Sequence, residues 1–202
     1  MDVSIIICCF NSETRLERTL EAISLQETKL KWEVLIIDNN STDKTVEVAT
    51  NFWNKLNHES SLEVFFEKEP GLSHARKCGV NNSKGELIIF CDDDNHLYPN
   101  YVKNANSIMA SDNNLGALCG KNTPKFMGPQ DTIINSFIEA YACGELYSKS
   151  TYLTGKSSPW GAGLVVRSKF MKTLYNELNF SSILSDRKGN TLSSGGDTEF
   201  CY

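Results

Sequence analysis

The stretch Ile88–Asn95 reads IIFCDDDN: an apolar run ends abruptly at three consecutive carboxylates. The apolar part begins near Glu86, and it has the length and composition of a strand that is buried on both faces. Such strands belong to α/β sheets, which bind ligands beyond the carboxyl ends of their strands. We therefore expect Asp92, Asp93 and Asp94 at a ligand-binding edge of a sheet.

The acidic triplet itself fits two interpretations. Adjacent carboxylates repel one another and are costly to bury without a partner. A divalent cation would relieve the repulsion, and Mg²⁺ commonly binds one or two carboxylates together with phosphate oxygens. The alternative is a solvated acidic turn, because most charge runs are surface features. The triplet alone leaves open a metal-and-phosphate site and an exposed turn.

The composition is that of an ordinary globular domain. The chain has 202 residues, of which 40% are hydrophobic and 22% charged, and this suits one domain with a real core. The net charge of -5 gives no basic footprint, so we expect no nucleic-acid partner. No apolar run reaches the length of a membrane span, and no signal peptide opens the chain. The seven cysteines lack zinc spacing and indicate a reduced, cytosolic protein.

Strand-like and helical segments alternate in the first half of the chain. Apolar runs predict strands over 3–10, 33–37, 62–66 and 86–91, with helices between them. Asn11 or Ser12 is expected to cap the first helix. This order implies right-handed crossovers and a mostly parallel sheet, which is an α/β fold. Further on we expect helices over 99–110, 133–146 and 170–178, strands over 115–120 and 164–166, and a polar loop over 185–196.

The loop after the first strand reads Cys8-Cys9-Phe10-Asn11 and has no glycine-rich phosphate fingerprint. Its absence argues against a dinucleotide-binding Rossmann domain and against a P-loop. Instead an acid, Asp38, ends the second strand as well. A carboxylate at Asp38 could accept a hydrogen bond from a base N–H or a ribose hydroxyl. It could equally be a turn aspartate that bonds its own backbone, and the residue alone does not decide.

Several segments, taken together, resemble the family 2 glycosyltransferases, which have the GT-A fold. Each is weak alone, but their order and spacing carry the resemblance over nearly the whole chain. In sequence order they are Val3–Asn11, Val34–Thr45, Gly71–Gly79, Gly85–Asn95, Trp160–Arg167 and Gly195–Glu199. The resemblance implies a mostly parallel central sheet flanked by helices. It also implies a single domain over 1–202, with a nucleotide-sugar-binding half at 1–98 and an acceptor-binding half at 99–202.

On the donor side, the resemblance implies that Phe10 and Asp38 flank the nucleobase, with Asp38 accepting a hydrogen bond from its edge. Cys8, which is also expected to pack within its strand, counts among the donor-binding positions. Arg76 would lie near the nucleotide and its diphosphate.

The acids Asp92 and Asp94 look like the outer members of the family's D-x-D motif. The resemblance implies that Asp92 faces the ribose or the metal, and that Asp94 ligates a Mg²⁺ or Mn²⁺ ion bridging the diphosphate. Asp93 fills the variable place and is counted with the residues that bind the nucleotide-sugar. An acid there leaves open which two of the three ligate the metal.

On the acceptor side, Trp160, Gly161, Ala162 and Gly163 resemble a segment whose missing side chains let a sugar approach the backbone. Arg167, at the end of that segment, is expected either to touch phosphate or acceptor or to lie on the solvated surface. Asp197 resembles the catalytic base. Many family members have a Glu before this Asp, and Gly196 stands there in this chain.

The resemblance implies inverting transfer from a nucleotide-sugar, with UDP favoured over GDP or dTDP, to a saccharide or lipid-linked acceptor. Such enzymes build polysaccharide or cell-surface glycan, which implies a cytoplasmic protein at the inner face of the cell membrane. The chain stops in mid-pattern at Tyr202, so we expect a C-terminal truncation and peripheral membrane association through the missing segment. The alternatives are a nucleotidyltransferase, which should show a glycine-rich basic loop after its first strand, and a catalytically inactive nucleotide-sugar-binding domain.

Overall fold

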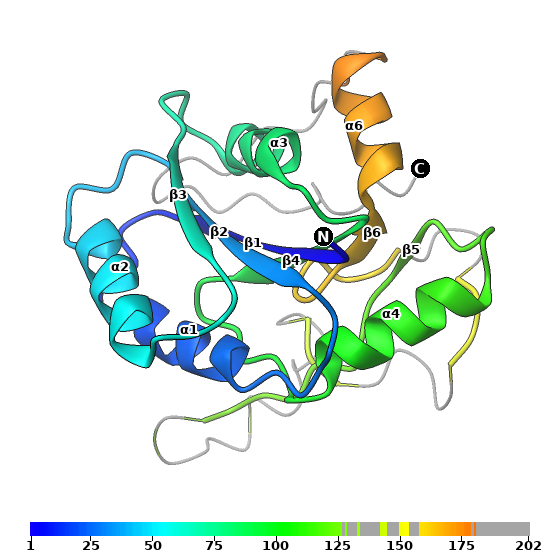
Figure 1. The fold of residues 1–202 in the computed structure, drawn as a ribbon, viewed down its shortest axis with the longest axis horizontal. Coiled ribbons are helices and arrows are strands. Elements are labelled where there is room, and N and C mark those ends of the chain that lie inside the picture. The colour runs from blue at the N-terminus through cyan, green and yellow to red at the C-terminus, as the bar shows by residue number, and fades with distance from the viewer. Residues whose placement is uncertain are drawn as a thin grey trace.

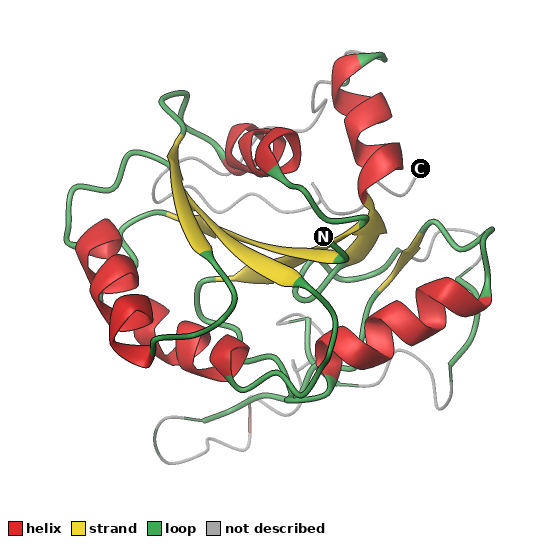
Figure 2. Ribbon diagram, viewed as in Figure 1, coloured by secondary structure: helices red, strands yellow, loops and turns green. Residues whose placement is uncertain are grey.

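The computed structural model describes residues 1–126, 128, 133, 142–144, 150–153, 158–178 and 180. Within these residues, a six-stranded sheet has the order β3-β2-β1-β4-β6-β5 (Figures 1 and 2). The parallel strands are β1 (Val3–Cys9), β2 (Trp32–Asp38), β3 (Leu62–Phe66) and β4 (Leu87–Asp92). Two short antiparallel strands extend the sheet, β6 (Val165–Arg167) beside β4 and β5 (Ala117–Leu118) beside β6. The predicted α/β fold with a mostly parallel sheet is confirmed.

The helices cover both faces of this sheet (Figure 1). One face carries α1 (Leu16–Ser24), α2 (Thr45–Leu56) and α4 (Tyr101–Ser111), and the other carries α3 (Leu72–Asn82) and α6 (Ser168–Asn176). A strand between two helical layers must be apolar on both faces, and β1 and β2 are buried almost throughout. This explains why both strands read as continuous apolar runs.

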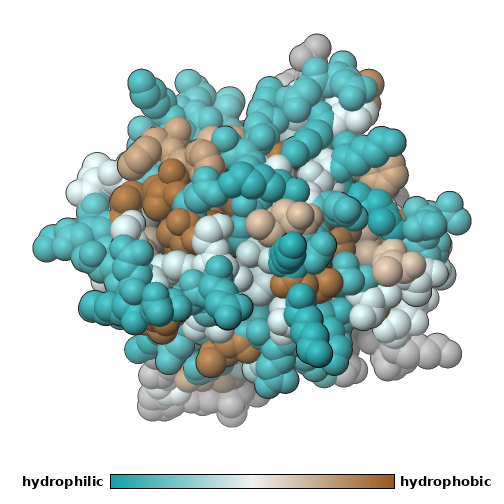
Figure 3. Space-filling model, in the orientation of Figure 1, coloured by the Kyte–Doolittle hydropathy of each residue, from teal (hydrophilic) through white to brown (hydrophobic). Residues whose placement is uncertain are grey.

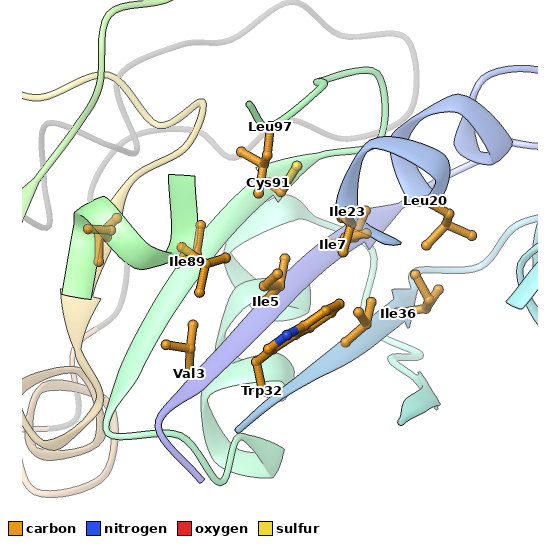
Figure 4. Close-up of a cluster of buried hydrophobic side chains, with 14 of the residues drawn as sticks. Val3, Ile5, Ile7, Leu20, Ile23, Trp32, Ile36, Ile89, Cys91 and Leu97 are labelled. Atoms are coloured by element: carbon orange, nitrogen blue, oxygen red, sulfur yellow. The ribbon is translucent and has the colours of Figure 1, made fainter. Parts of the chain in front are cut away.

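Successive residues of β1 belong to different cores because side chains alternate across a strand. Ile5 and Ile7 join the core beneath α1, α2 and α4, while Ile6 joins the core beneath α3 and α6. Figure 4 shows the first of these clusters, where Ile5 and Ile7 lie among Ile89 of β4 and Ile23 of α1. Burying each such side chain contributes about 1.5–3 kcal/mol to the free energy of unfolding, so the apolar residues of β1 stabilise both cores.

The strand order reverses direction at β1. The chain leaves β1 through α1 to reach β2 on one side, then returns through β3 and α3 to place β4 on the other side. Ligands of open α/β sheets bind beyond the carboxyl ends of the strands at such a switch point. The topology therefore places the candidate site where β1, β2 and β4 end.

The start of α1 differs from the prediction that Asn11 or Ser12 caps it with a side chain. A turn precedes the helix, and the Ser12 carbonyl accepts from the amides of Arg15 and Leu16 at 3.1 and 3.0 Å. The Ser12 hydroxyl instead donates to Asp93, and Asn11 takes a left-handed backbone conformation with φ of 51°. The prediction is wrong because long-range partners compete for both polar side chains.

The surface seen in Figure 3 is mostly hydrophilic, with apolar side chains gathered over the edge strand β3. The residues of β3 are half-buried up to Phe66, which is 67% exposed. Within the described ranges, every helix is too short or too polar to cross a membrane. The expected helix over 133–146 lies mostly outside the described residues, and the expected loop over 185–196 lies wholly outside them.

A glycine just before β4 allows the close approach of two strands. A Cβ at Gly85 would lie 2.5 Å from the Ser4 amide nitrogen, 2.6 Å from the Val3 carbonyl carbon and 2.8 Å from the Leu87 oxygen. All three are backbone atoms, which cannot move cheaply. We expect Gly85→Ala to lower the free energy of unfolding by about 1–3 kcal/mol in urea denaturation. Gly116→Ala is the matched control, since nothing lies within 4 Å of a Cβ there. Equal stability of the two variants would contradict this account.

The thiols at the ends of β1 and β4 give a second test. Burial raises the pKa of Cys8 to about 12, and it raises the pKa values of Cys9 and Cys91 well above their ordinary range. In the unfolded chain these thiols ionise near pH 8.5, whereas in the folded chain they stay protonated. Their contribution to the free energy of unfolding is therefore fully present below that pH and is lost as the pH rises toward 12. We expect the free energy of unfolding, measured by urea denaturation, to fall between about pH 8 and about pH 10, by roughly 2 kcal/mol through Cys8 and by a further amount through Cys9 and Cys91. The Cys8→Ala variant should show a smaller fall, and an identical pH dependence would refute the assignment.

Candidate functional site

The strand register brings two of the sequence-predicted acids to one edge of the sheet. Asp38 lies opposite Cys9 in the pairing of β1 with β2, and Asp92 lies opposite Cys8 in the pairing of β1 with β4. Asp38 is only 5% exposed, and its Oδ1 atom has no hydrogen-bond partner among the described residues. A buried carboxylate oxygen without a partner is costly, and a ligand N–H or O–H would satisfy it.

Arg76 lies on the opposite side of the sheet edge from α1. It is 4% exposed in α3, and its guanidinium carbon lies 5.5 Å from the centroid of the Phe90 ring. That contact is a cation–π interaction, which holds a positive charge in a buried position. After burial, the largest influences on the pKa of the Cys8 thiol are the opposing charges of Arg76, which lowers it, and Asp92, which raises it. Arg76, Cys8 and Asp92 therefore share one electrostatic neighbourhood at the end of β1.

The three acids of the triplet have different surroundings. Asp92 is half-buried at the end of β4, and Asp94 is exposed and accepts a hydrogen bond from Asn95 at 2.9 Å. Asp93 turns to α1, where its Oδ2 accepts hydrogen bonds from the Ser12 hydroxyl and from Arg15 at 2.7 Å. These partners use Oδ2, and the assignment of Asp93 to the nucleotide-sugar-binding residues stays a prediction.

The carboxylates can hold a metal only with help from a ligand. In the part of the chain that the structure describes, no three histidine, cysteine or acidic side chains cluster as a metal site would require. Asp92 and Asp94 supply oxygen ligands of the kind that Mg²⁺ and Mn²⁺ prefer. Mg²⁺ is commonly held by one or two carboxylates with phosphate oxygens and water, so these two acids fit an ion that is completed by a diphosphate.

Phe10 is 39% exposed just beyond β1, and the loop that carries it is tied to the loop after β2. The Asn11 amide donates to the Ser41 hydroxyl at 3.0 Å, and the Thr42 amide donates to Asn11 Oδ1 at 2.8 Å. Further along, the Ser12 amide donates to Thr45 Oγ1 at 2.7 Å. These bonds fix Phe10 relative to the end of β2, where Asp38 lies.

Asn39 ties the loop before α3 to the end of β2. Its side-chain amide donates to the carbonyls of Glu67 and Glu69 at 2.9 and 2.8 Å, and its Oδ1 accepts from the Gly71 amide at 2.8 Å. The Gly71 φ of 144° lies in the region that favours glycine, so the chain turns there into α3. Sequence reasoning missed Asn39 as a positioning residue, although the polar run after β2 was a signal of turn chemistry.

The expected acceptor-side segment lies directly beside β4. The Gly163 amide donates to the Phe90 carbonyl at 3.0 Å, and Gly163 has a left-handed φ of 77°. The Tyr101 hydroxyl from α4 donates to the Gly163 carbonyl, and a Cβ at Gly163 would lie 2.9 Å from that hydroxyl oxygen. Gly161 is buried, whereas Trp160 and Ala162 are half-buried. The structure therefore brings this segment close to the end of β4, where the acidic triplet begins.

Arg167 has a structural role that neither sequence interpretation foresaw. Its guanidinium donates to the carbonyls of Met109, Asp112 and Leu115 at 2.8, 2.9 and 3.0 Å. An arginine at a helix C-terminus satisfies carbonyls that have no partner within the helix, here at the end of α4. The expected solvated surface position is therefore wrong, and a contact with phosphate or acceptor stays a prediction. Asp197, the expected base, lies outside the described residues.

The sequence is similar to known glycosyltransferases. The model of the family described as "Glycosyl transferase family 2" matches residues 4–167. The cholesterol galactosyltransferase of Borreliella burgdorferi is 36% identical over 95 residues, which cover 47% of this chain and 25% of that protein. The poly(ribitol-phosphate) beta-N-acetylglucosaminyltransferase TarS of Staphylococcus aureus is 27% identical over 150 residues, which cover 68% of this chain and 26% of that protein. The chain spans about a quarter of the length of these curated relatives.

Solved structures of transferases have the same fold. The structure of S. aureus TarS 1–349 in complex with UDP superposes with a TM-score of 0.62 at 20% identity, covering 85% of this chain and 48% of that one. The mannosyltransferase PcManGT from Pyrobaculum calidifontis, in complex with GDP-Man and Mn²⁺, gives a TM-score of 0.55 at 27% identity, covering 59% of this chain and 35% of that one. The expected GT-A fold is confirmed by these likenesses. Since the family model extends from β1 through β6, the chain belongs to glycosyltransferase family 2.

Proposed function

We propose that this chain transfers a sugar from a nucleotide-diphosphate sugar to an acceptor hydroxyl with inversion. The observation that carries the proposal is the pair Asp38 and Asp92 on either side of the β1 terminus, with Asp38 Oδ1 buried and unpartnered among the described residues. Family membership supports glycosyl transfer over nucleotidyl transfer. The catalytically inactive alternative is decided by a product assay.

The donor base would lie between Phe10 and Asp38. Asp38 Oδ1 is an acceptor in need of a donor, and the imide N–H of uracil is a donor of the right kind. The exposed ring of Phe10 offers a flat apolar surface next to it. We favour UDP-sugars, which is supported by the UDP complex of TarS, whereas the GDP-Man complex of PcManGT shows that donors differ among structural neighbours.

The diphosphate would lie between Arg76 on α3 and the acids at the end of β4. Asp92 and Asp94 would hold Mg²⁺ or Mn²⁺, and the bound ion would neutralise the charge that develops on the leaving diphosphate. Arg76 contributes a second, fixed positive charge from its buried position over Phe90. Asp92, which lies opposite Cys8 near the end of β1, would also accept from a ribose hydroxyl.

The acceptor would approach over Trp160–Gly163, where Trp160 and Ala162 are half-buried beside the end of β4. Asp197 is the proposed base, which takes the proton from the acceptor hydroxyl as its oxygen attacks the anomeric carbon. No covalent intermediate is needed, and the Cys8 thiol is poorly suited to be a nucleophile because its raised pKa keeps it protonated. We propose a saccharide or lipid-linked acceptor in polysaccharide or cell-surface glycan synthesis, in the cytoplasm at the inner face of the membrane.

The donor proposal predicts that Asp38→Ala weakens UDP binding. Loss of the carboxylate removes the acceptor and leaves the base N–H without a partner, so the cost should be about 1–3 kcal/mol, or roughly 5- to 150-fold in Kd. Isothermal titration calorimetry measures it. Asp112→Ala is the matched control, because its carboxylate is exposed at the end of α4, where Tyr152 bonds it. Unchanged UDP affinity in a folded Asp38→Ala variant would count against the base position.

The mechanism predicts that Asp197→Asn lowers turnover by about 10²–10⁴-fold while UDP affinity stays nearly intact. The assay follows glycosylated product and released nucleotide from a panel of UDP-, GDP- and dTDP-sugars, with the intact protein. Glu199→Gln removes the other acid of this segment; it is the matched control and should lower turnover less. Near wild-type turnover by Asp197→Asn would remove the proposed base. Absence of sugar transfer from every donor by the wild-type protein would favour a catalytically inactive domain.

A further inference from the structure

Arg15 connects two of the loops that form the candidate site. Just before α1, its guanidinium donates to the carbonyls of Phe10 and Asn11 at 3.2 and 3.1 Å, and to Asp93 Oδ2 at 2.7 Å. The first two acceptors follow β1, and the third follows β4. A guanidinium presents several donors in a rigid planar fork, so it can bridge acceptors on separate segments. One side chain therefore connects the loop after β1, which carries Phe10, to the acidic triplet after β4.

Asp93 is held at its side chain and at its backbone. The Ser12 hydroxyl donates to the same Oδ2 atom that Arg15 contacts, and the Thr19 hydroxyl of α1 donates to the Asp93 carbonyl at 3.0 Å. Ser12 and Thr19 are both fully buried, which makes these contacts part of a packed layer. The Asp93 side chain is 14% exposed in its ion pair with Arg15. Asp93 is thus anchored to α1 and to the residues just before it.

This anchor determines how the neighbouring acids can point. Successive residues at a strand end face opposite sides of the sheet. Asp92, the last residue of β4, lies opposite Cys8 and near Arg76 on the α3 side. With Asp93 fixed on the α1 side, Asp92 is kept on the other side, and Asp94 stays exposed in the turn. Without the anchor, the turn could rotate and the three carboxylates could exchange places.

We propose that Arg15 and Asp93 are positioning residues, which hold Asp92 and Asp94 in the orientation that binds the metal–diphosphate group of the donor. This inference rests on the proposed function and deepens it. Asp93 acts here through Asp92 and Asp94, and it is not itself a ligand of the metal. The rival interpretation is that Asp93 is the second metal ligand and that its contact with Arg15 is broken when the metal binds.

The two interpretations predict different effects of Arg15→Gln on metal-dependent UDP binding. This variant removes the partner of Asp93 and keeps all three carboxylates. If the pair positions the ligands, Arg15→Gln and Asp93→Asn should each weaken Mn²⁺-dependent UDP binding by about tenfold, the lower end of the range for losing a group that orients metal ligands. The double variant should be no weaker than either single variant, because both changes break the same contact. Arg15→Lys, which keeps the charge, should recover part of the loss. Calorimetry of UDP binding to the intact protein measures this, with Mn²⁺ and with EDTA.

Controls separate positioning from general effects of charge and folding. Lys55→Gln removes one positive charge from an exposed position in the last turn of α2, and it should leave Mn²⁺-dependent UDP binding within about twofold of the wild type. Urea unfolding at neutral pH should show that every variant is folded at the temperature of the titration. UDP affinity in EDTA should change little in Arg15→Gln, because the effect acts through the metal ligands.

Four results would overturn the inference. Wild-type or tighter Mn²⁺-dependent binding by Arg15→Gln, with weak binding by Asp93→Asn, would make Asp93 a ligand. Additive losses in the double variant would show that the two residues act separately. An equal loss of UDP affinity in Arg15→Gln with Mn²⁺ and with EDTA would show that Arg15 only holds the loop that carries Phe10. A wild-type protein that binds UDP equally with Mn²⁺ and EDTA would instead refute the metal part of the proposed function, and this inference with it.

Discussion

The structure depends on the burial of β1 between two strands and two helical layers. Because β1 pairs in parallel with both β2 and β4, all three strands end at the same edge. Their interiors are apolar on both faces except for the hydrogen-bonded pair Ser4 and Glu33, so most polar side chains lie where the strands end. Asp38 and Asp92 lie at two such ends, on either side of Cys8 and Cys9. The packing that stabilises the sheet is therefore also what brings the two acids together.

A second layer of order comes from hydrogen bonds between the loops that follow these strands. Asn11 joins the loop after β1 to the loop after β2, and Asn39 joins the end of β2 to the start of α3. Arg15 joins the loop after β1 to the loop after β4. Each bond satisfies a buried or half-buried polar group, which limits the positions that a loop can take. A site built in this way is preorganised, so less ordering remains to be done when a ligand binds.

Much of the fold and the strand-end acids could be predicted from the sequence, because burial leaves a strong local pattern. The continuous apolar runs of β1, β2 and β4 are visible residue by residue, and a parallel order then dictates where Asp38 and Asp92 lie. The partners of these residues could not be predicted in the same way. Asp93 pairs with Arg15, which lies 78 positions away in the sequence, and no local pattern marks that pair.

The same reason explains the predictions that were wrong. Ser12 has the chemistry of a helix cap, but a distant carboxylate uses its hydroxyl. Arg167 looks like a solvated surface cation, but three carbonyls at and after the end of α4 use its guanidinium. In both cases the residue type predicts the kind of bond correctly, and tertiary structure decides the partner. The segment 121–158 has weak periodicity, so its sequence predicted little beyond one helix.

The central claim is that a nucleotide-sugar binds across the ends of β1, β2 and β4. The most direct test is a crystal structure of the intact protein with a UDP-sugar and Mn²⁺. We expect the uracil between Phe10 and Asp38, with its N–H donated to Asp38 Oδ1, and the diphosphate with its metal between Arg76 and Asp94. A nucleotide bound elsewhere, or bound here with its base away from Asp38, would contradict the account.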